Sequence, residues 1–405
     1  MWTNIKGGSE MLLHANDEIR ETYGACFTAK EIAQQPDLWE QVYLNFQSKH
    51  HEIIDFFSRI SRDHEQVRVI FTGAGTSAFV GDTIVPYVKR ITDLKKMHIE
   101  SIPTTNIVSS PYYYLQPDIP TILVSFARSG NSPESVAAAQ LGEQIIHSVY
   151  HIILTCNEEG NLAKQFQHKE NAFVMYMPQE ANDQGFAMTG SFTSMMLTAL
   201  MLCNYNQTHL LEPSIMDIVR LGKDVIKKQE QEIQRIAEKE FRKIVFLGSG
   251  VFEGLSREAA LKFLELTAGR IPVTFDTTLG FRHGPKSILD KDTVVVLFLS
   301  NDEYTKKYDL DLLKELFQEK ERSEIIVIAH QDNQEARRNS NTFLCNDGRN
   351  LKDDMYITFI YILYGQILAL YKSIALGITP DNPCPSGSVN RIVRGVTVHP
   401  YKGKE

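Results

Sequence analysis

Cysteine is scarce in this chain, and the few cysteines present are scattered. The 405 residues contain five of them, none in a C-x-x-C pair: Cys26, Cys156, Cys203, Cys345 and Cys384. Such wide spacing excludes a disulfide framework and offers no cysteine-based metal site. The sequence therefore predicts reduced thiols, a cytoplasmic location and no bound metal.

Long apolar runs and excess positive charge are lacking too. No apolar run approaches the roughly 18 to 20 residues of a membrane span. The first twenty residues carry Glu10, Asp17 and Glu18 and lack the apolar stretch of a secretory signal. A net charge of −8 argues against nucleic acid or an anionic membrane as the main partner. We therefore expect a small molecule as the ligand.

Strand and helix patterns alternate along most of the chain. Short apolar runs typical of buried parallel strands occur at 66–72, 121–127, 151–156 and 172–178, and again at 243–250, 293–300 and 324–330. Helical spacing predicts an N-terminal helical segment, 1–50, a charged helix at 216–241 and a last long helix near 353–375. The predicted fold class is α/β, with tandem doubly wound, flavodoxin-like parallel-sheet domains at 51–210 and 211–380 and an extended C-terminal tail at 381–405.

The two series resemble copies of one unit. "VIFTGAGTSAFVGD" matches "IVFLGSGVFEGLSRE" with Gly73 and Gly248 175 positions apart, and the strands beginning at Thr121 and Thr293 are 172 positions apart. Such similar offsets indicate a duplicated α/β unit. The copies differ after their strands, because the first has hydroxyl side chains where the second has Asp302 and Glu303, which would repel an anion.

Two loops of the first copy have the composition of an anion-binding site. Both follow strands, so we expect them to meet at the carboxyl edge of one sheet, where open α/β sheets bind ligands. Ser132 is a good helix N-cap with Pro133 after it, so the second loop ends on a helix N-terminus that favours a phosphate. The predicted phosphate-binding residues are Thr76, Ser77, Arg128, Ser129, Gly130, Asn131 and Ser132. The loops lack a Walker lysine, so a nucleoside triphosphate is not suggested, whereas a sugar phosphate fits.

Two other interpretations fit parts of these loops. "GAGTSA" matches the dinucleotide fingerprint, with Glu100 placed for a ribose contact, but this leaves the hydroxyl groups of the second loop unexplained. Serine-rich turns without any ligand are common, yet two of them in matching strand–loop–helix positions are not expected by chance. The phosphate interpretation is therefore favoured.

At these loops the chain resembles the sugar isomerase (SIS) domain family. "GAGTSA" and "SFARSGNSPES" are similar to the two phosphate-binding loops of that family, and the likeness extends from about residue 50 to the end as two tandem domains. "GLSREAALKFLELTAG", "GFRHGPKSILD" and "NPCPSGSVNRIVRGVTVHP" resemble the tagatose-6-phosphate ketose/aldose isomerases, a subfamily that includes galactosamine-6-phosphate deaminases. The isomerase half of glucosamine-6-phosphate synthase shares this plan.

The resemblance implies particular site residues. It assigns the phosphate to Ser77, Ser129 and Ser132 and to the backbone of Arg128, which stands where the family has a glutamine. Weaker substrate-binding candidates are Thr189 and Ser191 in "AMTGSF" and Arg394, where the synthase has a lysine. The resemblance also implies no metal or organic cofactor, and a homodimer or higher homo-oligomer with a shared active site, in which His283 acts across the interface.

The second copy supplies candidate acid–base groups. Glu258, Lys262 and Glu265 are spaced four and three apart, so they share one helix face. A solvated salt-bridge stripe would explain this spacing in an arbitrary helix, and a lone histidine such as His283 is more often structural. Here the surrounding residues are apolar, and the resemblance implies a catalytic role for all four. Histidine suits ring opening, and a partly desolvated carboxylate suits proton transfer between C1 and C2.

The sequence therefore predicts a sugar-phosphate aldose–ketose isomerase or deaminase. The expected substrate is a hexosamine-6-phosphate or a ketohexose-6-phosphate, and an enediol or enolamine is the intermediate. Two alternatives stay open: a deglycase of phosphorylated fructosamine adducts and a non-catalytic sugar-phosphate sensor. Amidotransferase activity is not expected, because the chain begins Met-Trp-Thr without a second-position cysteine.

Overall fold

Two five-stranded parallel sheets form the framework of the computed structural model, which describes residues 11–319, 323–348, 350–391 and 395–403. The first sheet has the order β2-β1-β3-β4-β5, with β1 at Val67–Thr72, β2 at Met97–Ser101, β3 at Thr121–Ala127, β4 at Val149–Thr155 and β5 at Ala172–Tyr176. The second has the order β10-β9-β8-β6-β7, with β6 at Lys243–Gly248, β7 at Val273–Asp276, β8 at Thr293–Phe298, β9 at Glu324–Ala329 and β10 at Thr342–Cys345.

The strand order confirms the predicted duplication. Numbered within its own half, each sheet runs second, first, third, fourth, fifth, which is the flavodoxin-like order. In this order the direction of winding reverses between the first and third strands, here β1/β3 and β6/β8. Ligands of doubly wound sheets bind outside the carboxyl ends of the strands at that point.

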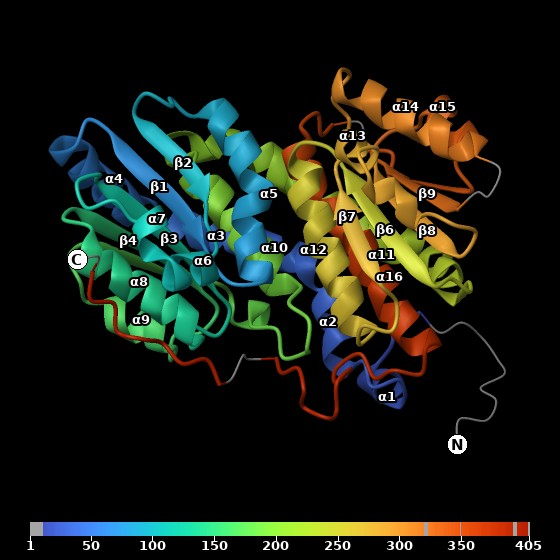
Figure 1. Ribbon diagram of the computed structural model, residues 1–405, viewed down its shortest axis with the longest axis horizontal. Helices are drawn as coiled ribbons and strands as arrows, with labels where there is room; N and C mark the ends of the chain where they lie inside the picture. The colour runs from blue at the N-terminus through green and yellow to red at the C-terminus, as the bar shows by residue number, and fades with distance from the viewer. Residues whose placement is uncertain (1–10, 320–322, 349, 392–394, 404–405) are drawn as a thin grey trace.

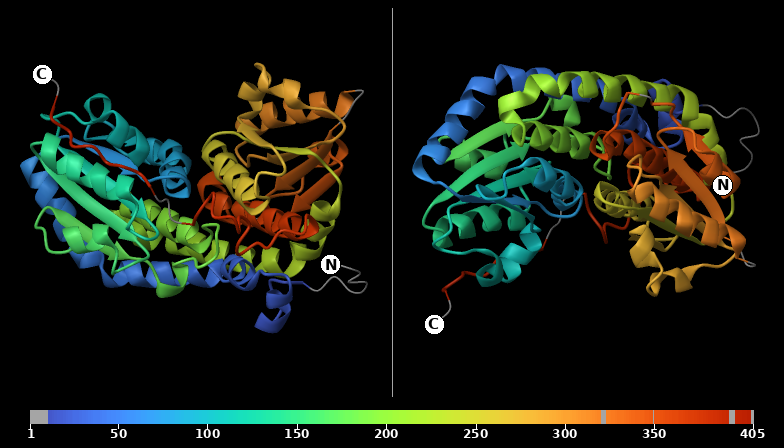
Figure 2. Two further views of the ribbon diagram at one scale, coloured as in Figure 1. Left: turned by 60° about the horizontal axis from the view of Figure 1, so that its bottom comes forward. Right: turned by 90° about the horizontal axis from the view of Figure 1, so that it is seen from above.

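A layer of helices lies between the two sheets (Figures 1 and 2). It contains α3 (Gln35–Ser48), α5 (Thr76–Ile91), α10 (Gly190–Leu202), α11 (Glu212–Glu238), α12 (Val251–Leu266) and α16 (Asp354–Ala375). One hydrophobic core joins these helices to the inner faces of both sheets, where Phe71 and Phe126 of the first sheet and Phe246 and Phe298 of the second are fully buried. Burial of large aromatic side chains is a major source of stability.

Shorter helices cover the remaining surfaces. The N-terminal segment forms α1 (Asp17–Thr22), α2 (Cys26–Ala33) and α4 (His50–Asp63) besides α3. The outer face of the first sheet is covered by α6 (Thr104–Ser109), α8 (Pro133–Ile145) and α9 (Asn161–Phe166), with α7 at Pro111–Tyr114. On the second half lie α13 (Thr278–Phe281), α14 (Thr305–Gln318) and α15 (Gln334–Arg338), and the 3-10 turns are η1 (Gln179–Ala181), η2 (Tyr205–Leu210) and η3 (Pro285–Ile288).

Helix α16 corrects one expectation. The chain does contain one helix that is long and apolar enough to cross a membrane by length and composition alone. In the structure 94% of its most apolar window is buried, mainly against α11 and α12. A helix that is apolar all round and covered by other helices is a core helix of a large domain.

The C-terminal tail crosses from the second half to the first (Figure 1). Asp381 accepts hydrogen bonds from the backbone N–H groups of Phe27 and Thr28, at 3.0 and 2.8 Å, at the start of α2. Further along, the carbonyl of Tyr401 accepts a bond of 2.8 Å from Gln144 on α8. The tail thus ties the N-terminal helices and both halves together.

Contact between α5 and α12 brings the two halves together. Gly254 of α12 lies so near α5 that a Cβ at this position would be 2.6 Å from the backbone nitrogen of Thr83. Beside it, Arg257 forms a 2.8 Å ion pair with Asp82, and its guanidinium lies 4.4 Å from the ring centre of Phe79. These contacts fix the position of α12 relative to the first sheet.

Replacing Gly254 by alanine tests this packing. The added methyl group meets backbone atoms that cannot rotate away, so we expect the free energy of unfolding to fall by about 1–3 kcal/mol. Gly365→Ala is the matched control, because its methyl group would meet only the side chain of Ala259 and its Cα atom, at 3.1 and 3.8 Å. Chemical denaturation measures both variants, and equal stabilities of the two would contradict the close approach.

Candidate active site

The two phosphate-loop candidates lie side by side, as the strand order requires. One loop follows β1 and enters α5 at Thr76, while the other follows β3 and enters α8 after Ser132. Because β1 and β3 are hydrogen-bonded neighbours, both loops lie at the carboxyl edge of the first sheet. Ser132 caps α8 by accepting a bond from the backbone N–H of Ser135 at 3.3 Å, as its sequence position predicted.

The second loop is held in shape by a neighbouring segment. The side-chain amide of Asn157 donates to the carbonyl of Ser129 at 2.9 Å, and the backbone N–H of Asn161 donates to Asn131 at 3.0 Å. The carbonyl of Gly130 accepts a bond from Leu162 at 3.0 Å. The loop is thus preformed, and this reduces the entropy lost when it binds an anion.

The acid–base candidates form a buried charged row on α12. The ammonium of Lys262 lies 2.5 Å from a carboxylate oxygen of Glu265 and 3.6 Å from Glu258. Glu258 is fully buried and Lys262 is 1% exposed, whereas 25% of the Glu265 side chain reaches solvent. The arrangement is therefore not a solvated surface stripe.

Burial sets the protonation states of this row. It raises the pKa of Glu258 to about 8, and the nearby charge of Lys262 limits the rise. Burial acts to lower the pKa of Lys262, but Glu258 and Glu265 outweigh it, so the pKa is raised and the ammonium stays charged. Near neutral pH the row thus holds a mostly protonated Glu258 beside the ammonium of Lys262.

This row adjoins the phosphate loops across the domain boundary. Thr76, at the start of α5, lies close enough to Glu258 to oppose the rise of its pKa. The charge of Arg128 acts on Lys262 from the second loop. The structure therefore places the hydroxyl-lined loops of one half against the acid–base row of the other.

The side chain of Arg128 is engaged with the C-terminal tail. Its side chain is buried and turns toward the C-terminal tail, donating to the carbonyl of Arg391 at 2.9 Å. Arg391 in turn donates to the carbonyl of Asp183. Burial, followed by the charge of Arg128, lowers the pKa of Arg391. Arg391 was missed in the sequence, because only the path of the tail brings it here; the candidate Arg394 lies outside the described residues.

Thr189 and Ser191 are engaged within the protein. Both hydroxyl groups donate to the buried carboxylate of Asp183, at 2.9 and 2.5 Å, and so do the backbone N–H groups of Thr189, Gly190 and Ser191. Asp183 thereby satisfies the N-terminus of α10. The same segment is held from α2, where Glu31 accepts bonds from the backbone of residues 184 and 185. No local pattern in the sequence pointed to this network.

His283 lies apart from the other three acid–base candidates. It is exposed and follows α13, after the carboxyl end of β7. Helix α12 starts from the carboxyl end of the neighbouring strand β6, whereas Glu265 lies in the last turn of α12. The helix axis between these points is about 20 Å long. Within one chain, His283 and Glu265 are therefore not brought together.

The second half has a buried carboxylate at its crossover point, where the first half has its hydroxyl-bearing loops. Asp309 is fully buried at the β6/β8 crossover point and accepts bonds from the hydroxyl of Ser249 at 2.7 Å, the hydroxyl of Thr278 at 2.9 Å and the backbone N–H of Ser300 at 3.0 Å. Asp302, which was expected to repel an anion, accepts bonds from backbone N–H groups at the start of α14. The second half thus supplies its own anion.

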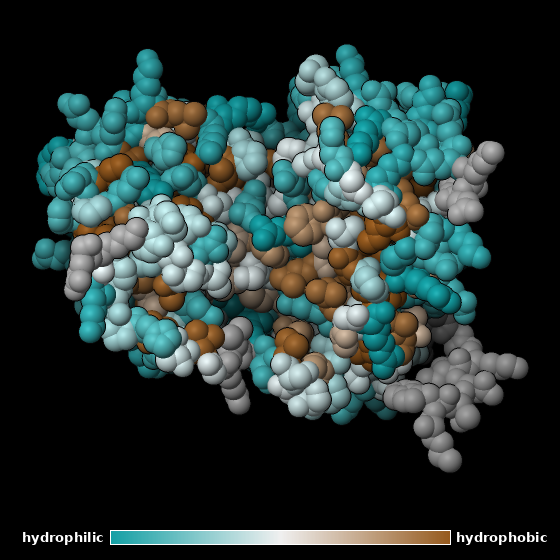
Figure 3. Space-filling view, viewed as in Figure 1, coloured by the Kyte–Doolittle hydropathy of each residue, from teal (hydrophilic) through white to brown (hydrophobic). Residues whose placement is uncertain are grey.

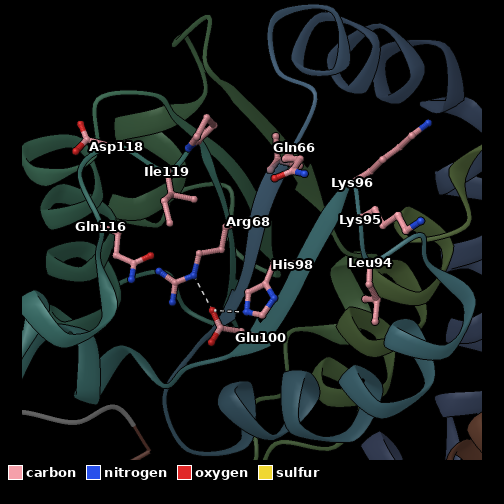
Figure 4. A pocket seen from close by; sticks show the side chains of 12 residues that line it. Gln66, Arg68, Leu94, Lys95, Lys96, His98, Glu100, Gln116, Asp118 and Ile119 are labelled. Carbon is pink, nitrogen blue, oxygen red and sulfur yellow. Dashed lines mark hydrogen bonds and ion pairs between the residues drawn. The ribbon is translucent and has the colours of Figure 1, made fainter.

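A cavity of about 530 Å³ lies away from these loops, at the amino-terminal side of the first sheet (Figure 4). Glu100 points toward Arg68 and His98 there, and its carboxylate lies 2.6 Å from the Arg68 side chain. The acidic residue of the dinucleotide interpretation is thus engaged in an ion pair.

Comparison with known proteins identifies relatives along the whole chain. The SIS domain model matches residues 64–205 and 238–370. The D-galactosamine-6-phosphate deaminase AgaS of Shewanella sp. (strain ANA-3) is 39% identical over 393 residues, which cover 97% of this chain and 96% of the relative. A glutamine–fructose-6-phosphate aminotransferase of Legionella pneumophila (strain Lens) is 24% identical over 70% of this chain and 46% of its own length.

Solved structures agree with these matches. A crystal structure of a protein from Clostridium novyi NT is 41% identical, covers 97% of this chain and 100% of its own, and has a TM-score of 0.92. The tagatose-6-phosphate ketose/aldose isomerase from Escherichia coli is 36% identical, covers 96% and 99% of the two chains and has a TM-score of 0.85.

The protonation state of Glu258 can be tested through stability. Between about pH 4.5 and 8 the folded protein retains a proton that the unfolded chain releases, so stability from this group is complete below pH 4.5 and is lost as pH rises to about 8. Glu258→Gln removes this titration. As the pH rises across this range, the free energy of unfolding of the wild type should fall more steeply than that of Glu258→Gln. The expected difference between the two slopes is on the order of 1 kcal/mol per pH unit.

Urea denaturation at pH 5, 6, 7 and 8 measures the difference. Glu40→Gln, at an exposed position of α3, is the control for general effects of removing a carboxylate. Parallel pH–stability curves for the wild type and Glu258→Gln would contradict the raised pKa.

Proposed function

The chain belongs to the SIS domain family, and from this premise we propose that it is a sugar-phosphate isomerase or deaminase. The proposed substrate is galactosamine-6-phosphate, or a ketohexose-6-phosphate of the tagatose type. Names of relatives that match nearly the full length support this choice. The structural observation that carries it is the contact of hydroxyl-lined loops with a buried Glu258–Lys262–Glu265 row.

The first half would hold the phosphate. Ser77, Ser129 and Ser132 lie at or beside helix N-termini at one sheet edge, where hydroxyl and backbone N–H donors can surround a dianion. In this proposal residues 51–210 bind the phosphate, residues 211–380 supply acid–base groups and the tail from residue 381 covers the junction. Arg128 anchors that tail and adds positive charge near the phosphate.

Glu265 is the proposed base. Its carboxylate is partly exposed, so an open-chain sugar can reach it, and an ion pair of 2.5 Å with Lys262 holds it in place. It removes the proton from C2 of the open-chain aldose and returns a proton to C1, through an enediol or, with an amine at C2, an enolamine. The amine then stands as an imine at C2, and addition of water releases ammonia and the ketose. Protonated Glu258 adds no negative charge beside the intermediate.

His283 is proposed to open the sugar ring in the active site of a second copy. Within one chain, His283 lies near the start of α12 and Glu265 near its end. This separation supports a site shared between subunits of a cytoplasmic homodimer or higher homo-oligomer. Apolar side chains gather over α12 and β7 in the middle of one face (Figure 3), and Leu264, Phe275 and Leu279 are each more than a third exposed. Because β7 is an edge strand, this face is a candidate subunit interface.

Release of ammonia and ketose from galactosamine-6-phosphate and glucosamine-6-phosphate tests the activity. We expect Glu265→Gln to lower kcat by on the order of 10²- to 10⁴-fold while substrate binding is retained, because the amide cannot accept the proton. Wild-type turnover in this variant would refute the base. Binding without turnover of any hexose phosphate would favour a sensor, and turnover of fructosamine phosphates alone would favour a deglycase.

Mixing two inactive variants tests the shared site. If His283 of one copy acts with Glu265 of another, a mixed dimer of Glu265→Gln and His283→Asn subunits has one site with both native residues. We therefore expect activity to return when the variants are unfolded and refolded together. Each variant refolded alone is the control, and no recovery despite verified mixed dimers would place both residues in one chain's site.

A further inference from the structure

The loop that carries His283 leaves the imidazole exposed and does not fix its orientation through side-chain contacts. His283 is exposed, and within the described part of the chain its side chain has no hydrogen-bond or ion-pair partner. Its orientation therefore depends on the backbone of the loop between α13 and η3. Directly after His283 that backbone turns at Gly284, whose φ of +124° is a conformation that favours glycine.

Two basic residues flank His283, and both form ion pairs with the carboxylate of Glu315. Before the histidine, Arg282 lies 2.9 Å from Glu315 of α14; after it, Lys286 forms an ion pair with the other oxygen of Glu315. Lys286 also pairs with Glu319, the residue that ends α14. Glu315 thus connects both sides of the His283 turn to one helix.

These ion pairs differ from ordinary surface pairs. An isolated exposed pair contributes little, because water screens it and two long side chains lose freedom. Here the side chains of Arg282 and Lys286 are only 28% and 25% exposed, and the pairs form a network that joins two separate elements. The loop is also anchored by Phe281, which is fully buried in the core of the second half.

We propose that Glu315 is a positioning residue for His283, acting through Arg282 and Lys286. The proposal rests on the ring-opening role of His283 given above. An imidazole that must reach the sugar of another subunit has to be held by its own loop, since misplacement by about 1 Å can lower a rate by up to 100-fold. Glu315 supplies that constraint without touching the substrate.

Glu315→Gln tests the proposal, because the amide keeps the shape and loses the charge. We expect kcat on ring-closed galactosamine-6-phosphate to fall about 10- to 100-fold with little change in KM. Turnover of an analogue without the 4- and 5-hydroxyl groups, which cannot close a ring, should stay near the wild-type value. Glu303→Gln is the matched control, because the exposed carboxylate of Glu303 forms a 2.9 Å pair with Lys306 at the other end of α14; the kcat of this variant should be unchanged.

A double-mutant comparison separates positioning from a general structural effect. In the His283→Asn background, Glu315→Gln should cause no further loss on the ring-closed substrate. A loss that persists there, or an equal loss on both substrates, would overturn the proposal. Glu319→Gln is the milder second variant, which removes only one contact of Lys286, and it should give a smaller loss confined to the ring-closed substrate. Loss of folding in Glu315→Gln would leave this milder variant to decide the outcome.

His283→Asn alone distinguishes failure of this proposal from failure of the proposed function. If it retains full turnover on both substrates, ring opening by His283 and its positioning by Glu315 both fall, while the base role of Glu265 stands. If it loses turnover and folded Glu315→Gln does not, only the positioning role is overturned.

Discussion

The contact between α5 and α12 is the constraint on which the rest of the site depends. The loops that suit a phosphate belong to one half of the chain and the acid–base row to the other, so neither half forms the site alone. A glycine at position 254 lets the two helices approach until backbone meets backbone. At that distance Thr76 lies close enough to oppose the rise in the pKa of Glu258, and the charge of Arg128 acts on Lys262. A wider spacing would leave Glu258 and Lys262 exposed to water and remove the desolvation that sets their protonation.

Duplication of one α/β unit gave two crossover points, and the chain uses them differently. At β1/β3 the loops present hydroxyl and N–H groups toward an open edge. At β6/β8 the equivalent position is filled by the carboxylate of Asp309, which accepts three hydrogen bonds from the surrounding loops. Burial raises the pKa of Asp309, and these hydrogen bonds oppose the rise. This difference between the halves is consistent with the proposal that only the first half binds an external anion.

Much of the fold follows from local sequence patterns, whereas the site depends partly on distant contacts. The expected strands were found within a few residues, because buried parallel strands are continuous apolar runs. Strands β2, β7 and β10 were missed; they are short edge strands with half-exposed residues, so their composition resembles that of loops. The loops and the α12 row could be predicted because each lies within one motif. The bond from Arg391 to the carbonyl of Asp183 could not, since it joins residues that are 208 positions apart in the chain.

Local charge explains how an acidic chain can suit an anionic substrate. The net charge of the chain is −8, but the balance of basic and acidic side chains around the candidate phosphate loops differs from that of the whole chain. With Glu258 protonated, the α12 row is neutral, because Lys262 balances Glu265. Arg128 and Arg391 then add positive charge beside the row, and Asp183 is saturated by five donors at the start of α10. In the proposed site, Arg128 and Arg391 would thus oppose the repulsion that an acidic chain exerts on a phosphate, and the distant acidic surface would be screened at physiological salt.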